Sequence, residues 1–463
     1  MQKNDIVRLQ IEEINNLGCG VAHIDGNGQD AGKAVFVRDA VTHDLLDARI
    51  IKVNKSYLVA RIEKLITPSP LRIGEEACSR AGCGGCVYRH IDYNHEKELK
   101  RAYVQNAFRK AGLSDVTVEE VRSTGALTRY RNKAQYPVAN TKNGVEAGFF
   151  ATGTHRIVPV TDCPLQPEPF AQILTYVCDF CKKNRISAYD EETQKGLLRH
   201  VYLRTGAATG EIMVTLVVNG KSLPKEGELA KTLADRFPSV KSIMLNVNTA
   251  NTNVVLGEEY RLLWGREYIE DQLCTQTYRI SAGAFYQVNH DACELLYTLA
   301  GEAAALTGKE TLLDLYCGIG TIGLSLASKA EKVIGIEIVE EAVERAKENA
   351  LRNGVKNAHF YCGDASDAEK LLESAEKAHG DVSGATVIMD PPRKGSTPEL
   401  IRYLAKRGFT RIVYISCNPD TLARDCALFT TLGYTLSPVT PVDLFPRTGH
   451  VESVVCLKRQ IQQ

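Results

Sequence analysis

The segment Asp314-Leu-Tyr-Cys-Gly-Ile-Gly-Thr321 follows an apolar run and precedes a helical pattern. Its glycines, Gly318 and Gly320, let the backbone turn tightly and approach a ligand closely. The first acidic residue at the end of the next expected strand is Glu337. A carboxylate at that place can accept hydrogen bonds from both hydroxyls of a ribose. The segment therefore predicts an α/β fold with a nucleoside-type cofactor above a strand–helix junction.

The same glycines allow more than one ligand. Gly318-Ile-Gly-Thr-Ile-Gly323 matches the dinucleotide fingerprint, so a nicotinamide oxidoreductase is one interpretation. The acidic residue Asp314, which stands before the first glycine, favours S-adenosylmethionine. This cofactor has no pyrophosphate, so it does not require a helix N-terminus to bind one. A glycine turn without any ligand is the third interpretation.

Helical and apolar strand patterns alternate around this segment, from residue 291 to the end at 463. Strands are expected at 311–315, 332–336 and 385–389, and a helix is expected at 340–353. Such alternation is typical of a parallel sheet with crossover helices, a Rossmann-like arrangement. Ligands of such sheets bind outside the carboxyl ends of the strands.

Three reactive side chains stand at the ends of expected strands in this region. Asp390 ends an apolar strand and is followed by two prolines that stiffen the chain, while Cys417 ends the next strand. A cysteine on an apolar strand is usually a core residue, but the polar flanks Ser416 and Asn418 favour a nucleophile here. Glu452 is a lone acid at the start of the last strand, where a surface position is the alternative.

The regions before residue 291 have a different pattern. Residues 1–66 read as short alternating strands with Gly, Asp and Asn turns, which predicts a small β-barrel, and 67–70 reads as a linker. Residues 71–290 form the expected central region, with a Cys- and Gly-rich loop at 71–95, a helix at 95–110 and mostly strands and turns from 129 onward. Strands of the first region are expected at 6–11, 33–37, 46–51 and 56–60.

Composition favours a cytoplasmic globular protein. Hydrophobic residues make up 44% of the 463, no apolar run approaches a membrane span, and the N-terminus has no apolar signal region. The net charge is zero, so a nucleic-acid partner would need a local basic surface. Lys97–Lys133 is such a stretch, with nine Lys or Arg against four Asp or Glu, although a solvated helix face explains it equally well. Nothing indicates an obligate protein partner.

The Asp-Pro-Pro-Arg, Ser-Cys-Asn-Pro and His-Val-Glu motifs follow the glycine loop in this order. Together they resemble the RNA uridine-carbon-5 methyltransferases, and most of all the bacterial 23S ribosomal RNA members that carry an iron–sulfur cluster. The resemblance covers nearly the whole chain. It implies an N-terminal TRAM domain, an RNA-binding barrel of oligonucleotide-fold type, and a central domain inserted before the methyltransferase domain.

The resemblance also implies roles for individual residues. Cys417 would be the nucleophile and Glu452 the base in methyl transfer from S-adenosylmethionine to carbon 5 of uridine. Asp314 and Gly318 are expected at the cofactor from the glycine loop itself. Further cofactor contacts would be Gln287, Tyr316, Glu337, Asp390 and, on the adenine side, Asp364.

A cysteine cluster belongs to the same resemblance. It implies a 4Fe–4S cluster on Cys78, Cys83, Cys86 and Cys163, although the first gap holds four residues where the family usually has five. Four thiolates suit zinc as well. The chain holds 14 cysteines, and the close pair Cys178 and Cys181 lies in a helical pattern that favours the core.

The segment 129–136 resembles an RNA-contacting stretch of the family, because it joins aromatic and cationic side chains. Its expected contact residues are Arg129, Tyr130, Arg131, Lys133 and Tyr136. We expect 23S ribosomal RNA as the substrate, with transfer RNA left open. An oxidoreductase leaves the Ser-Cys-Asn-Pro motif and Glu452 unexplained, and the Cys417–Glu452 pair argues against a non-catalytic RNA-binding or redox-sensing protein.

Overall fold

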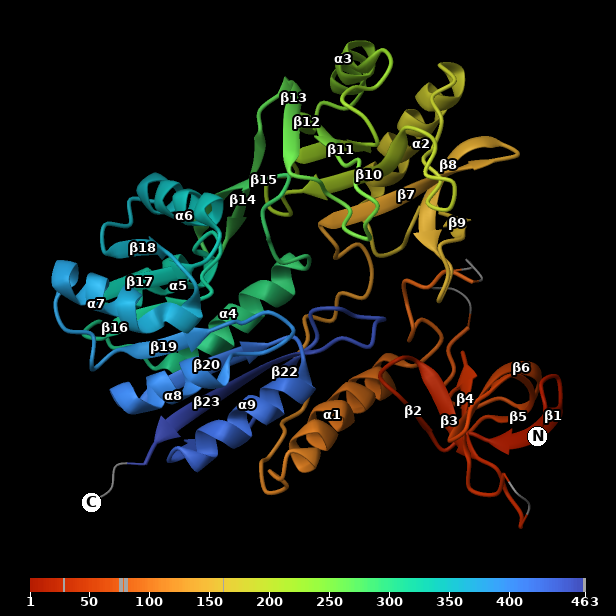
Figure 1. The fold of residues 1–463 in the computed structure, drawn as a ribbon, viewed down its shortest axis with the longest axis horizontal. Coiled ribbons are helices and arrows are strands. Elements are labelled where there is room, and N and C mark those ends of the chain that lie inside the picture. The colour runs from red at the N-terminus through yellow and green to blue at the C-terminus, as the bar shows by residue number, and fades with distance from the viewer. Residues whose placement is uncertain (28–29, 75–77, 79–81, 161, 461–463) are drawn as a thin grey trace.

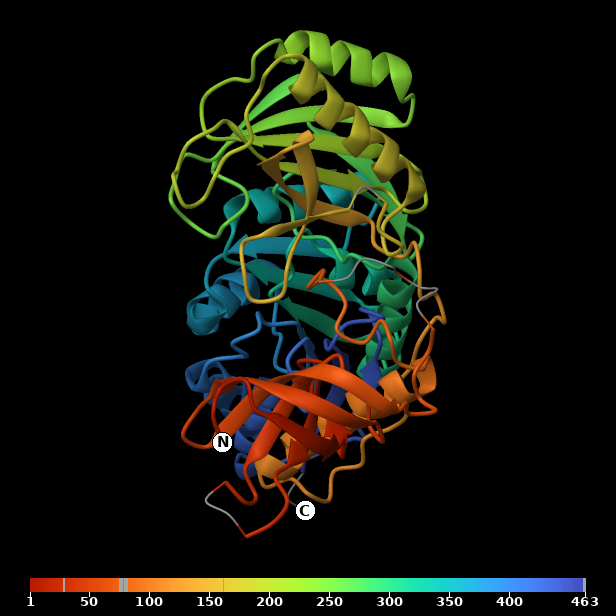
Figure 2. The ribbon, with the colours of Figure 1, turned by 90° about the vertical axis from the view of Figure 1, so that its right-hand side faces the viewer.

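The computed structural model describes residues 1–27, 30–74, 78, 82–160 and 162–460. They form three regions, each built on its own larger sheet (Figure 1). The sheet of the central region lies at one end of the molecule in both views, and in Figure 2 much of the C-terminal region lies between it and the N-terminal sheet (Figures 1 and 2). No helix in the described part of the chain is long and apolar enough to cross a membrane.

The N-terminal region is a six-stranded sheet of order β1-β5-β6-β4-β3-β2. The strands are β1 (Ile6–Gln10), β2 (Glu13–Ile14), β3 (Cys19–His23), β4 (Ala34–Arg38), β5 (Leu45–Val53) and β6 (Tyr57–Thr67). The four expected strands correspond to β1, β4, β5 and β6. Alternate residues such as Leu46, Ala48 and Ile50 of β5 point into one core, which is the period that the sequence pattern predicts.

Helix α1 (Tyr93–Lys110) begins at the N-cap Asp92, whose carboxylate accepts from two backbone N–H groups. The sequence placed α1 within the central region. In the structure its buried face, with Val104 and Phe108, packs in the core of the C-terminal region and lies beside α9 (Pro419–Thr431) (Figure 1). The segment after α1 also joins that region, because Val118 and Arg122 make β-bridges to residues 439 and 442.

The central region is a seven-stranded sheet of order β13-β12-β11-β10-β7-β8-β9. The strands are β7 (Lys133–Thr141), β8 (Gly144–Phe150), β9 (Ile157–Pro159), β10 (Leu198–Thr205), β11 (Ile212–Val218), β12 (Val240–Val247) and β13 (Glu259–Gly265). Two helices, α2 (Glu168–Lys183) and α3 (Glu226–Arg236), pack on one face (Figure 2). Cys178 and Cys181 of α2 are buried in this core, as expected. The hairpin of β14 (Tyr268–Leu273) and β15 (Gln276–Ser281) leads to the C-terminal region.

The C-terminal region has the sheet order β18-β17-β16-β19-β20-β23-β21, with β22 paired to β23. The strands are β16 (Thr311–Leu315), β17 (Lys332–Glu337), β18 (Ala358–Cys362), β19 (Thr386–Met389), β20 (Arg411–Ser416), β21 (Tyr434–Leu436), β22 (Thr440–Val442) and β23 (Glu452–Arg459). The strands from β18 to β20 are parallel, and β23 is antiparallel to β20. The order reverses between β16 and β19, which is where α/β sheets bind ligands.

Helices cover both faces of this sheet. They are α4 (His290–Ala304), α5 (Thr321–Leu326), α6 (Glu340–Arg352), α7 (Ala368–His379), α8 (Pro398–Arg407) and α9, with 3₁₀ turns η2 (Ala327–Lys329) and η3 (Ala365–Asp367). Successive strand residues face opposite layers: Leu312 packs with α4, α5 and α6, whereas Leu313 packs with α1, α8 and α9. The parallel sheet expected from the sequence is thus buried on both faces.

All three regions meet at the segment 443–450, which leads into β23. Gly449 lies against the backbone of Asn16 in the N-terminal region. The Tyr88 N–H donates to the carbonyl of Arg447, and the Tyr130 hydroxyl donates to the carbonyl of Pro446. This segment carries the chain directly to Glu452, so its placement fixes where β23 begins.

A single methyl group tests that contact. A Cβ on Gly449 would lie 1.9 Å from the Asn16 carbonyl oxygen, a backbone atom that cannot rotate away. We expect Gly449→Ala to lower the free energy of unfolding by about 1–3 kcal/mol, as overpacking does. It should also speed hydrogen exchange at residues 15–18. Urea unfolding and exchange mass spectrometry measure both effects. The control is Gly384→Ala, since nothing described lies within 4 Å of its added Cβ; equal effects in the two variants would contradict the contact.

Candidate active site

The loop after β16 is held open by a carboxylate of the neighbouring strand. The Gly318 N–H donates to Glu337 Oε2 at 3.0 Å, and the Val339 N–H donates to Glu337 Oε1 at 2.9 Å. Tyr316 and Gly318 have positive φ angles of 66° and 54°. Nothing in the described residues lies within 4 Å of a Cβ built on Gly318. The loop backbone is therefore free to approach a ligand at the carboxyl end of the sheet.

Asp314 lies beneath this loop. It is fully buried, and its Oδ2 accepts from the Gly323 N–H at 2.8 Å. Burial raises the pKa of Asp314 to about 7. Within the described residues its Oδ1 has no hydrogen-bond partner. Asp314 thus holds the first turn of α5 from below, which supports the loop and leaves the outer surface to other residues.

Asp364, which is expected at the cofactor, lies at the same edge. The Gly363 N–H donates to the carbonyl of Glu337, which places Asp364 beside the end of β17, and its charge acts on Tyr316. Burial is the main cause of the raised pKa of Tyr316. Gln287 precedes α4 with only 8% of its surface exposed, and its carbonyl accepts from Asn132 Nδ2 at 2.8 Å.

Strand pairing brings the thiol and the acid together. In the antiparallel pair of β20 and β23, Ser416 stands opposite Ser453. Cys417 follows the first and Glu452 precedes the second, so both lie at the same end of the pair. Asp390 follows β19, the parallel neighbour of β20, and reaches this end as well. The structure therefore gathers Asp390, Cys417 and Glu452 as the strand order requires.

The two carboxyl groups hold protons tightly. Glu452 is 3% exposed, and burial followed by the nearby charge of Asp390 raises its pKa well above the usual range. Asp390 keeps some accessible surface, but protein surrounds its carboxyl group, and burial raises its pKa to about 7. Two buried carboxylates that repel each other do not both ionise readily at neutral pH. The pair can accordingly hold or release one proton at this edge.

The thiol of Cys417 is half-buried, and its surroundings disfavour the thiolate. Burial is the first cause that raises its pKa to about 11, and the charges of Glu452 and Asp390 add to it. Arg393 acts in the opposite direction through its charge and a hydrogen bond. Arg393 Nη2 is 2.8 Å from His450 Nδ1. Both residues stand inside the quoted motifs, Asp-Pro-Pro-Arg and His-Val-Glu, yet the sequence reasoning assigned a role to neither.

The segment expected to contact RNA is turned inward. Tyr136 is fully buried and packs on Phe149 at 5.1 Å between ring centroids, and Tyr130 is 9% exposed. Arg129 pairs with Asp162 at 2.7 Å. Burial followed by the charge of Arg204 lowers the pKa of Lys133 to about 8. The two tyrosine rings do not face solvent, so the expectation that they stack on bases is not met in this structure.

The four cysteines expected to bind a cluster line one cavity of about 250 Å³, together with Arg131 and Arg447. Burial raises the pKa of Cys86 to about 12, and the neighbouring thiols Cys163 and Cys83 are the next causes. The backbone of Cys83 forms an isolated β-bridge with Ala151 of the central region, and the Gly84 N–H donates to the carbonyl of Phe150. Within the residues that the structure describes, no three His, Cys, Asp or Glu side chains are grouped closely enough to hold a single metal ion.

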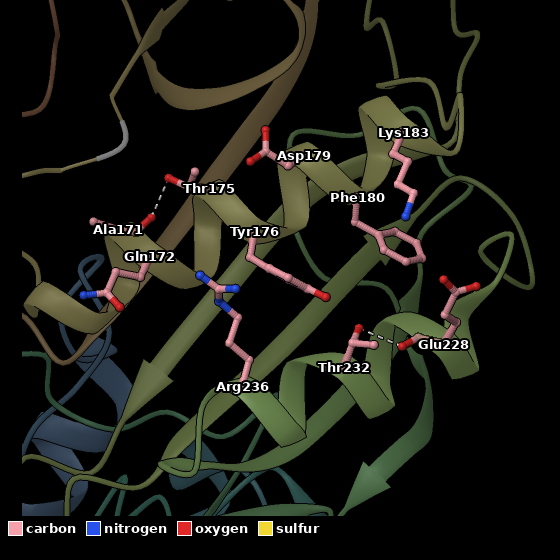
Figure 3. A pocket seen from close by; sticks show the side chains of 10 residues that line it. All are labelled: Ala171, Gln172, Thr175, Tyr176, Asp179, Phe180, Lys183, Glu228, Thr232 and Arg236. Carbon is pink, nitrogen blue, oxygen red and sulfur yellow. Dashed lines mark hydrogen bonds between the residues drawn. The ribbon is translucent and has the colours of Figure 1, made fainter.

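Another cavity, of about 700 Å³, lies between α2 and α3 of the central region (Figure 3). Its walls combine the ring of Tyr176 with charged ends such as Asp179, Lys183 and Arg236, which stand apart along the two helices (Figure 3). All its lining residues belong to these two helices. It is separate from the strand ends where the thiol and the acids meet, so we place the candidate active site at the strand ends.

A buried ion network fixes the segment that precedes Glu452. Lys100 of α1 is 1% exposed, and its Nζ donates to Glu96 Oε1 at 2.8 Å and to Asp443 Oδ1 at 2.7 Å. The Arg447 N–H donates to Glu96 Oε1 at 2.7 Å, and the Tyr93 hydroxyl donates to Asp443 Oδ2. Lys100 belongs to the basic stretch considered for RNA, but here it is a structural cation.

Comparison with known proteins identifies the family. The family model of the tRNA (uracil-5-)-methyltransferases matches residues 92–460. The chain belongs to this family. An uncharacterized RNA methyltransferase of Halalkalibacterium halodurans is 41% identical over 461 residues, which cover 99% of this chain and 98% of that protein. One of Bacillus cereus is 40% identical over 460 residues, with the same two shares of 99% and 98%.

A solved structure agrees with this assignment. The Pyrococcus abyssi tRNA (uracil-54, C5)-methyltransferase, crystallised with S-adenosyl-L-homocysteine, is similar with a TM-score of 0.76 at 28% identity. The similarity covers 97% of this chain and 100% of that one. The resemblance to RNA uracil-carbon-5 methyltransferases and the α/β methyltransferase fold are thus confirmed. Membership in this family favours methyl transfer over the nicotinamide oxidoreductase.

The ion network can be tested by removing its ammonium group. We expect Lys100→Met to lower the free energy of unfolding by about 3–5 kcal/mol, because Asp443 and Glu96 lose their buried cation. Burial already raises the pKa of Glu96. Protonation removes an unpaired carboxylate, so the variant should lose less stability at pH 5 than at pH 8. Urea unfolding at both pH values measures this. Lys110→Met, at the exposed end of α1, is the control, and a change below about 1 kcal/mol at position 100 would contradict the network.

Proposed function

We propose that this protein transfers a methyl group from S-adenosylmethionine to carbon 5 of a uridine in RNA. The observation that carries the proposal is the placement of Cys417 and Glu452 at one end of the β20–β23 pair, beside Asp390. This reaction requires a thiol and a carboxylate of the protein that can both reach the same uracil ring. Family membership supports the reaction class.

The strand ends suit the cofactor. S-adenosylmethionine supplies an electrophilic methyl group when it is bound. Glu337 would hold the ribose, Gly318 would allow close approach of the backbone, and Asp390, Tyr316 and Gln287 would line the remainder. The open space above Gly318 and the carboxylate at the end of β17 fit a nucleoside. The bound S-adenosyl-L-homocysteine of the Pyrococcus abyssi protein supports the same assignment.

Cys417 and Glu452 would act in sequence. The Cys417 thiolate forms a bond to carbon 6 of uracil, and the π electrons of the ring move to carbon 5, which becomes nucleophilic enough to accept the methyl group. Glu452 then takes the carbon-5 proton, the double bond forms again, and the sulfur leaves carbon 6 as a thiolate. A carboxyl group of raised pKa is a stronger base once ionised, and burial gives Glu452 that property. The uracil must leave its stack to reach this depth.

The N-terminal sheet would serve RNA binding as a TRAM domain. It touches the segment before Glu452 through Asn16 and Gly449, so RNA held on this sheet would lie close to the active site. For the substrate we propose 23S ribosomal RNA, supported by the resemblance to the cluster-containing members and by the cysteine cavity. Transfer RNA is the second candidate, because the solved relative acts on a transfer RNA. Methylation assays on transcripts of both RNAs separate the two.

The cysteine cavity suits a 4Fe–4S cluster. Four cysteines line one space of about 250 Å³, and four thiolates are the ligand set of such a cluster. Arg131 and Arg447 line the same space and would offset the negative charge of four thiolates. Cys78, Cys83, Cys86 and Cys163 would hold the cluster, and no step of methyl transfer passes through it.

The two proposed catalytic residues give different failures when changed. Cys417→Ala should lower methyl transfer by at least about 10⁴-fold, since no bond to carbon 6 forms. Glu452→Gln should still form that bond and methylate, then stall, which lowers turnover by about 10²–10⁴-fold and leaves RNA bound to the protein on a denaturing gel. Tritium transfer from labelled S-adenosylmethionine measures both. Cys362→Ala, at an exposed cysteine, is the control. Full activity in Cys417→Ala would reject the mechanism.

The cluster is tested by metal content. Protein purified without oxygen should be brown and contain about four irons and four sulfides per chain. Cys86→Ser should lose most of the iron, whereas Cys178→Ser, in the core of α2, should keep it. Iron and sulfide analysis with absorption near 400 nm measures this. Colourless protein with one zinc ion would contradict the cluster.

A further inference from the structure

The thiol of Cys417 faces two carboxyl groups and one cation. Glu452 from β23 and Asp390 from the end of β19 both disfavour its ionisation, and Arg393 is the group that favours it. At a pKa of about 11, roughly one thiol in 10⁴ is a thiolate at pH 7. A nucleophile that attacks as a thiolate needs compensation. The surroundings offer that compensation through Arg393.

Arg393 is fixed at both its ends. Its carbonyl accepts from Asn418 Nδ2 at 2.9 Å and from Thr421 Oγ1 at 3.3 Å, which ties its backbone to the turn that holds Cys417. The preceding residues Pro391 and Pro392 restrict the chain. Its guanidinium lies 2.8 Å from His450 Nδ1. The side chain thus spans from the Cys417 turn to the segment before Glu452.

His450 is suited to hold this guanidinium. Burial, followed by the charge of Arg393, lowers the pKa of His450 to about 4, so the ring is neutral at pH 7. Arginine has only donors, so Nδ1 must be the acceptor and Nε2 must carry the proton. The ring also packs edge-on against Phe445, at 5.9 Å between centroids. A neutral imidazole in a fixed orientation can accept a hydrogen bond from the Arg393 guanidinium without neutralising its positive charge.

We propose that Arg393 stabilises the thiolate of Cys417 and that His450 is the positioning residue that aims it. The inference rests on the proposed function, in which Cys417 is the nucleophile. The thiol proton passes to solvent, and the negative sulfur pairs with the guanidinium. The sulfur electron pair then forms the bond to carbon 6, and the negative charge moves onto the uracil ring. When the bond to carbon 6 breaks, the thiolate returns to Arg393.

The gain from such a cation is limited and measurable. Lowering a thiol pKa by one unit raises the thiolate fraction about tenfold but weakens its intrinsic reactivity about threefold, so the net gain is about threefold per unit at pH values below the pKa. An alternative role is a contact from Arg393 to an RNA phosphate, since the side chain is exposed. That role would not act on the thiol when RNA is absent.

Alkylation of Cys417 without RNA or cofactor separates these roles. The full-length protein is treated with iodoacetamide from pH 7 to pH 11, and peptide mass spectrometry follows Cys417, with the exposed Cys362 as internal reference. We expect Arg393→Gln to raise the apparent pKa of Cys417 by at least about one unit, a tenfold loss of thiolate at neutral pH. Arg393→Lys should restore part of the shift, since it keeps the charge but not the planar fork. Lys394→Gln, at the adjacent exposed cation, should match the wild type.

His450 is tested in the same assay. His450→Ala should shift the Cys417 profile in the same direction as Arg393→Gln but less, and His450→Gln, which keeps an acceptor oxygen, should restore most of it. A Cys417 profile that is identical in Arg393→Gln and wild type, in a folded protein, would overturn the proposal. If that variant instead shows only a weaker RNA affinity and a flatter salt dependence, Arg393 is a phosphate contact.

Methyl transfer distinguishes failure of this inference from failure of the proposed function. Activity of Arg393→Gln should fall about threefold or more, and by the same factor from pH 7.5 to pH 9.5, because this range lies below the pKa of Cys417 in both proteins. If Cys417→Ala keeps its activity, the proposed function fails, whatever the alkylation profile shows. If Cys417→Ala is inactive and the profile of Arg393→Gln is unchanged, only the role of Arg393 fails.

Discussion

The buried ammonium of Lys100, between the carboxylates of Glu96 and Asp443, joins helix α1 to the segment that leads to Glu452. Removing ions from water is costly, so such a group persists only where its hydrogen bonds are fully matched. Here Tyr93 and Arg447 complete the set. The segment 443–450 has no regular structure of its own, so this network takes the place of a helix or a strand in fixing it.

The same segment joins the rest of the molecule to the reaction. Arg447 lines the cysteine cavity and accepts from Tyr88, Gly449 lies against Asn16 of the N-terminal sheet, and His450 holds Arg393. The proposed nucleophile and base are then placed from two directions, by the ends of the parallel strands and by this segment. This placement buries the carboxyl groups of Asp390 and Glu452, which raises their pKa values. Acids with raised pKa values are suited to a reaction in which one proton is moved.

The sequence was informative where local pattern decides the structure. Strand β16, the glycine loop and Glu337 follow from an apolar run and two glycines, and the parallel order then brings Asp390 and Cys417 to one edge. It was uninformative where distant partners decide. Tyr136 reads as a stacking aromatic but fills the core beside Phe149. Lys100 reads as a surface cation, yet its partner Asp443 lies 343 positions away. Arg393 and His450 stood inside recognised motifs, but only the fold shows that they touch.

The central claim is that Cys417 attacks the same uracil on which Glu452 acts. RNA containing 5-fluorouridine tests it directly, because fluorine at carbon 5 cannot leave as a proton and the adduct cannot resolve. The protein is incubated with this RNA and S-adenosylmethionine, digested, and the RNA-linked peptide is sequenced by mass spectrometry. The account predicts one linked peptide, with the modified nucleotide on Cys417. Linkage to another cysteine, or no adduct with an enzyme that methylates ordinary RNA, would contradict it.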